Sequence, residues 1–119
     1  MSTHSASAAG QPAIHRVTLT SEDVQEVLHK LQILADNDDA EMPDGAPLTP
    51  QQRADLRALL PRHAGVWDVP QWAWKLIRDE MQDHCLVLRD IASDARRNYE
   101  DGQALRICKQ ATKFERLFA

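Results

Sequence analysis

The sequence feature that most constrains the fold is a long stretch without helix-breaking residues. After Pro70 there is no proline and no glycine until Gly102, and helix-favouring residues are frequent in between. Apolar residues recur along this stretch at steps of three, four or seven, which places them on one face of a helix. These residues are Ala73, Ile77, Met81, Leu88, Ile91, Ala95 and Tyr99. The pattern predicts one long helix over about residues 70–101, spanning roughly 45 Å at about 1.5 Å per residue.

Three shorter helices are predicted from local signals. Thr20 stands three residues before Asp23, and Thr49 stands three residues before Gln52, which is the spacing of a capping box. Apolar residues recur at helical spacing after each threonine, and Gly102 marks a break before an amphipathic C-terminal segment. The shorter helices predicted in this way cover residues 21–35, 50–60 and 103–117.

The remaining segments add little regular structure. Residues 1–13 are small and polar, which is typical of a flexible, disordered tail, residues 14–17 favour a short extended lead-in, and residues 36–47 favour an acidic loop. No segment alternates convincingly between apolar and polar residues, so strands are expected to be absent or trivial. We therefore predict an all-α fold over residues 14–119, a single four-helix bundle-like domain around one long central helix.

Charge and hydropathy limit the classes of function. The net charge is −4, but residues 1–47 hold two basic and eight acidic residues, whereas residues 48–119 hold twelve basic and ten acidic ones. The second part therefore favours an anionic partner, while the overall charge argues against indiscriminate nucleic-acid binding. No apolar run approaches ~20 residues and no signal-peptide pattern opens the sequence, so we expect a cytoplasmic protein with no membrane partner.

Candidate catalytic and metal-binding residues are few. His84 is next to Cys85, but consecutive helical residues point about 100° apart, so the pair does not match a nucleophile and its base. Glu80 and His84 are four residues apart and would supply half of a metal site, yet no second His, Cys or carboxylate motif completes it. A core or interface histidine with a hydrogen-bond partner is the favoured interpretation of His84. We predict no catalytic residue, no metal and no cofactor.

The two cysteines leave two interpretations open. Cys85 and Cys108 have no CxxC spacing, and each falls at or near the apolar face of a predicted helix. Two reduced thiols of a cytosolic protein are favoured, and a disulfide or redox switch is the alternative.

A tryptophan cluster is the first candidate interaction site. Trp67, Trp72 and Trp74 fall within eight residues, and Leu76 follows Trp72 by one helical turn. A helix that is apolar on two sides is either central in its own domain or covered by a partner. The cluster therefore packs against the 50–60 helix and the 61–69 connection, or it forms a protein interface.

A basic stripe is the second candidate. Arg106, Lys109, Lys113 and Arg116 recur at steps of three and four, which places them on one side of the last predicted helix. Two further cations, Arg96 and Arg97, lie near the end of the long helix. This stripe is interpreted in three ways: as a solvated face or one paired with acidic residues of the same chain, as a nucleic-acid backbone site, or as a site for an acidic protein.

The sequence thus favours a binding function over catalysis. The first hypothesis is a non-enzymatic protein-interaction module, either a homo-oligomer or an accessory subunit of a larger complex. The alternative is an accessory subunit that binds a nucleic-acid backbone through the basic stripe. Nothing in the sequence indicates a small-molecule substrate.

Overall fold

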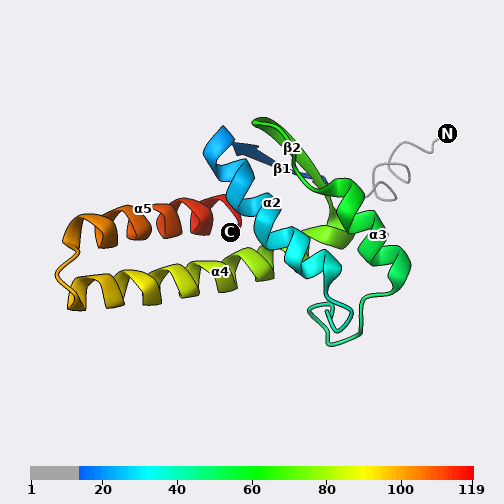
Figure 1. Ribbon diagram of the computed structural model, residues 1–119. Helices are drawn as coiled ribbons and strands as arrows, with labels where there is room; N and C mark the ends of the chain where they lie inside the picture. The colour runs from blue at the N-terminus through cyan, green and yellow to red at the C-terminus, as the bar shows by residue number, and fades with distance from the viewer. Residues whose placement is uncertain (1–13) are drawn as a thin grey trace.

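The structure, a computed structural model that describes residues 14–119, consists of four helices and a small sheet (Figure 1). The elements in chain order are β1 (Ile14–Leu19), α2 (Ser21–Asp36), α3 (Pro50–Leu59), β2 (Gly65–Pro70), α4 (Gln71–Arg97) and α5 (Asp101–Leu117). The prediction of a mostly helical chain is confirmed. The predicted tail, residues 1–13, lies outside the described residues.

The two predicted capping boxes are confirmed at the starts of α2 and α3. The Thr20 hydroxyl accepts a hydrogen bond from the Asp23 amide at 3.2 Å, and the Asp23 carboxylate accepts one from the Thr20 amide at 3.4 Å. Thr49 and Gln52 exchange the same pair of bonds at 2.9 and 3.0 Å. Each box satisfies backbone donors that a helix N-terminus otherwise leaves without a partner.

The expectation that strands are absent or trivial is wrong, although the extended lead-in predicted over residues 14–17 does lie within β1. β1 and β2 form a two-stranded antiparallel sheet, in which Val17 lies opposite Trp67. On both strands alternate side chains face the core, namely Val17 and Leu19 of β1 and Trp67 and Val69 of β2. Each strand has only six residues and its partner is far away in the sequence, so the alternation within one strand alone is too short to stand out.

The long helix ends earlier than predicted, at Arg97 instead of near residue 101. The turn is built on Tyr99, which has a φ of 63°, and the Glu100 amide donates to the Ala95 carbonyl at 2.8 Å. This left-handed residue after a helix end is usually glycine. Gly102, which the sequence suggested as the break, instead lies in the first turn of α5.

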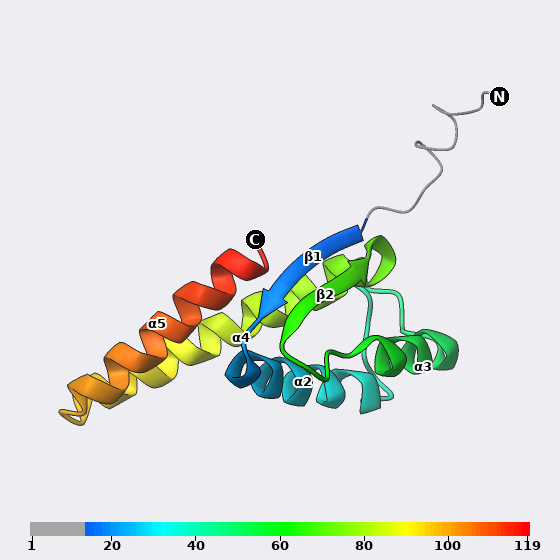
Figure 2. The same ribbon diagram turned by 90° about the horizontal axis from the view of Figure 1, so that it is seen from above.

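The fold is not confirmed as a four-helix bundle. Figures 1 and 2 show that α2, α3 and the sheet gather around the first part of α4, whereas the rest of α4 projects away from them with only α5 at its side. We call residues 86–109 the arm and the rest of the described chain the body. The molecule is accordingly elongated, with extents of 64 × 30 × 25 Å.

Body and arm have separate apolar cores. The body core holds large, fully buried side chains such as Leu31, Ile77 and Phe114. The arm core is built on small residues, and it consists of Ala92, Ala95 and Ala104 with the partly buried Ile107 and Cys108. Small residues allow α4 and α5 to approach closely, so this contact does not require a wide apolar face on either helix.

Candidate interaction surfaces

The predicted tryptophan cluster is divided between core and surface. Trp67 is 8% exposed, and its Nε1–H donates a 2.8 Å hydrogen bond to the Leu59 carbonyl. The Trp74 ring stacks on His15, with ring centroids 4.5 Å apart and planes 5° from parallel. Leu76 is buried as well. Three of the four residues predicted as an interface therefore pack inside the body. The sheet, which holds Trp67 on its inner face and brings His15 onto Trp74, was not predicted.

Trp72 is the exposed member of the cluster, with 38% of its surface accessible. It lies in the first turn of α4 and borders two depressions. One, of about 520 Å³, is also lined by Met42, Pro43, Asp44, Gln71 and Lys75. The other, of about 320 Å³, is also lined by Asp55, Ala58, Leu59 and Pro70. The indole thus forms the ridge between two adjacent hollows of the body.

The loop beside Trp72 is held by its own backbone bonds. A bridge pairs Glu41 with Pro47, and the Leu48 amide donates to the Ala40 carbonyl at 2.9 Å. Leu48 and Ala40 are both buried. The loop is therefore anchored at its base, and Met42 and Pro43 at its tip form a fixed wall of the larger hollow.

The predicted basic stripe is partly used within the chain. Lys113 Nζ lies 2.7 Å from the Oδ2 atom of Asp23, a carboxylate that is 1% exposed. Gln110 also donates to this carboxylate, at 3.2 Å. Burial alone raises the pKa of Asp23, but the hydrogen bonds from Lys113, Gln110 and Thr20 outweigh burial and hold the pKa below its ordinary value. Lys113 therefore ties the last helix to the acidic first helix, as one interpretation of the stripe anticipated.

The other predicted cations differ in their surroundings. Arg97 pairs with Asp94, and Arg96 Nη2 lies 3.5 Å from the Cys108 Sγ atom. Within residues 14–119, the remaining three cations of the stripe are exposed and make no ion pair. These are Arg106, Lys109 and Arg116.

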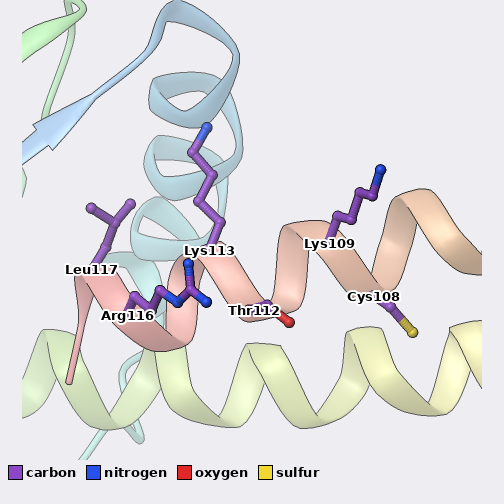
Figure 3. A pocket seen from close by; sticks show the side chains of 6 residues that line it. All are labelled: Cys108, Lys109, Thr112, Lys113, Arg116 and Leu117. Carbon is purple, nitrogen blue, oxygen red and sulfur yellow. The ribbon is translucent and has the colours of Figure 1, made fainter.

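A shallow depression of about 480 Å³ runs along the basic face of α5 (Figure 3). It is lined by Cys108, Lys109, Thr112, Lys113, Arg116 and Leu117. Figure 3 shows the Lys109 and Arg116 side chains extending from α5 on either side of the short Thr112 side chain. The hollow therefore has a small residue at its centre and cations at its ends.

An acidic face on α4 is the feature that sequence reasoning missed. Asp79, Asp83, Asp90 and Asp94 follow each other at steps of four, seven and four residues, and all are exposed. Leu86, which is 62% exposed, lies between the second and third of them. The spacing of these aspartates already places them on one face of a helix, but the prediction for this helix considered only its apolar residues.

The ionisable residues considered for catalysis or metal binding are engaged with neighbours. His84 Nε2 lies 2.5 Å from Glu26 Oε2, and Glu80 lies 3.6 Å from Lys30 Nζ. Cys85 is buried, and burial followed by the nearby Glu115 charge raises the pKa of its thiol to about 11. Both cysteines are free thiols in the structure. Among the described residues, no three His, Cys, Asp or Glu side chains are grouped closely enough to hold a metal ion.

No helix in residues 14–119 combines the length and the apolar character needed to span a membrane. Comparisons with protein-family models, curated proteins and solved structures gave no match to this chain. Hypotheses about function therefore rest on the surfaces described above.

Proposed function

We propose that this chain is a non-enzymatic protein-interaction module, and that Trp72 anchors a protein partner on the body. The observation that carries the proposal is the position of Trp72 between two hollows, at the start of a helix. A partner can place an apolar side chain into each hollow and enclose the indole from both sides. Tryptophan is enriched at such anchor positions, where it combines a large apolar surface with a polar N–H.

The exposed part of the indole accounts for a useful share of a binding energy. With 38% of the residue accessible, up to roughly 90 Å² of surface remains to be buried, which corresponds to at most about 2 kcal/mol at 25 cal/mol per Å². The rim of the two hollows carries Asp44, Asp55 and Lys75. Charges of both signs around an apolar centre are typical of a protein interface, in which the rim sets the register of the partner.

Further support comes from the residues that were considered for catalysis and metal binding. His84, Glu80 and Cys85 are each paired or buried, and this favours a structural role for them over a catalytic one. Free thiols at Cys85 and Cys108 also agree with the cytoplasmic location that we propose for the module.

The test compares wild-type protein with Trp72→Ala and with Val66→Ala as a matched control. Val66 is 67% exposed on β2 and does not line either Trp72 hollow. We expect the wild type and the control to capture the same proteins from a cell extract, and Trp72→Ala to capture at least tenfold less of them. The reason is that a loss of about 2 kcal/mol lowers the association constant by more than tenfold. Circular dichroism should show that the helices remain intact.

A second measurement follows the indole itself. Because Trp67 and Trp74 are buried, quenching of fluorescence by acrylamide reports mainly on Trp72, and a bound partner should protect it. If the same proteins bind the wild type and Trp72→Ala equally, and quenching is unchanged by the bound partner, Trp72 is not the anchor.

A further inference from the structure

Helices α4 and α5 carry two exposed faces of opposite charge, which extend from the arm into the body. Gln82, Arg89 and Arg96 of α4 reach α5, with hydrogen bonds to the Phe118 carbonyl, the Glu115 carboxylate and the Cys108 sulfur. These three residues are spaced by seven and mark the side of α4 that faces α5. The acidic residues lie well round the helix from that side. By the same reasoning, Lys109 and Arg116 lie about 100° round α5 from Cys108 and Glu115, which contact α4.

The two faces match in spacing as well as in charge. On α4, Asp83, Leu86 and Asp90 are separated by three and four residues, and on α5, Lys109, Thr112 and Arg116 are separated by the same steps. The end charges of each set are therefore about 10.5 Å apart along their helix axis. None of the four end residues makes an ion pair within residues 14–119, since Asp83, Asp90, Lys109 and Arg116 are all absent from the salt bridges of the described chain.

The two faces also match in shape. Leu86 projects from the middle of the acidic set and is 62% exposed. The depression of about 480 Å³ has Thr112 in its lining, between Lys109 and Arg116 along α5 (Figure 3). An apolar knob between two anions thus has its complement in a hollow between two cations.

We propose that this chain associates with further copies of itself by placing the acidic face of α4 of one copy on the basic face of α5 of the next. Within residues 14–119 the two faces make no ion pair with each other, so both remain available to a second copy. Leu86 enters the hollow around Thr112, while Asp83 and Asp90 pair with Lys109 and Arg116. Because each copy carries both faces, the contact is made once between neighbours in a ring or an open chain, or twice across a two-fold axis in a dimer. It is independent of the Trp72 proposal, since Trp72 lies about 21 Å from Leu86 along the helix.

Charge reversal provides the test. The average mass of the full chain is measured by light scattering over a range of concentrations, in about 50 mM and about 500 mM salt. The average mass of the wild type should grow with concentration, and high salt should reduce this growth because the ion pairs are exposed. The Asp83→Lys/Asp90→Lys variant and the Lys109→Glu/Arg116→Glu variant should each lose at least about tenfold in association constant.

Mixing the two reversed variants is the decisive step. The first variant has two basic faces and the second has two acidic faces, so each repels its own copies, and the mixture should assemble again. The control is Glu22→Lys/Asp39→Lys, which makes the same change in net charge as Asp83→Lys/Asp90→Lys at exposed positions of α2 and the following loop. Circular dichroism of every variant establishes that the helices remain folded.

Three results overturn the proposal. The first is a wild type that stays monomeric at every concentration, and the second is a mixture that fails to assemble when each variant is folded. The third is a particle that absorbs strongly at 260 nm and loses this absorbance in high salt or in Lys109→Glu/Arg116→Glu, because the basic face then holds a phosphate backbone. None of these results bears on Trp72, which is tested by partner capture.

Discussion

Replacing Asp23 tests how the body is held together. Its carboxylate is 1% exposed and accepts hydrogen bonds from the Thr20 amide, Gln110 and Lys113. Removing one partner of a buried ion pair typically costs about 3–5 kcal/mol. Lys113 is 44% exposed, so its ammonium reaches water once the carboxylate is gone, and the cost is smaller. We expect Asp23→Ala to lower the free energy of unfolding by about 2–3 kcal/mol, and Asp23→Asn, which keeps an acceptor in place, by about 1–2 kcal/mol.

Urea unfolding of the full chain measures these differences. Helix content by circular dichroism and the fluorescence of buried Trp67 and Trp74 should change together if unfolding is two-state. For an m value of about 1.5 kcal/mol per M, the midpoint of Asp23→Ala should fall by about 1.3–2 M. Glu22→Ala, an exposed neighbour on the same helix, is the matched control and should move the midpoint far less. A midpoint for Asp23→Ala equal to that of the control would refute the reasoning.

The same residue predicts a dependence on pH. Since the pKa of Asp23 is lower in the folded protein than in the unfolded chain, the carboxylate contributes stability that is fully present above its ordinary pKa of about 3.9. This contribution is lost as the pH falls through the lower folded value. The stability gap between the wild type and Asp23→Asn should therefore narrow between pH 7 and about pH 3. A gap that stays constant over this range would show that the charge on Asp23 is not what stabilises the contact.

Two further predictions concern the thiols and the turn of the arm. At pH 8 iodoacetamide should modify the partly exposed Cys108 well before the buried Cys85, whose pKa of about 11 leaves about one thiolate in a thousand. Peptide mass mapping measures the two rates, and equal rates would contradict the burial of Cys85. Tyr99→Gly should raise the free energy of unfolding by about 0.5–1 kcal/mol, because Tyr99 has a φ of 63° and its ring is 94% exposed. A thermal or urea scan measures this, and a loss of stability would mean that the side chain contributes a contact.

Local chemistry explains what the sequence predicted well. The starts of α2 and α3 were recoverable because each depends on residues three positions apart, Thr20 with Asp23 and Thr49 with Gln52. A capping box is complete within one turn and needs nothing from the rest of the fold. The end of α4 was not recoverable in this way, because Tyr99 adopts a backbone conformation that its type disfavours.

The sheet and the fate of the tryptophans depend on contacts between distant segments. Trp67 is buried because it lies on the inner face of β2 and donates to Leu59 of α3. Trp74 is covered because β1 brings His15 onto its ring. Neither contact can be predicted from the six residues that separate these two tryptophans. The sequence therefore located an aromatic cluster but could not tell that Trp72 alone among its tryptophans would remain exposed.

The arm shows why a stripe of apolar residues overestimates a core. Ile91 and Tyr99 were counted with the buried face of the long helix, yet Ile91 is 45% exposed and Tyr99 lies beyond the helix end. The contact with α5 is made instead by Ala92, Ala95 and Ala104. Small residues draw the two helices together along a narrow line, and the larger apolar side chains beside that line stay at the surface. The apolar surface that the arm leaves exposed is available to a binding partner. On α4 this surface is bordered by acidic residues, and their charge is complementary to that of the basic face of α5.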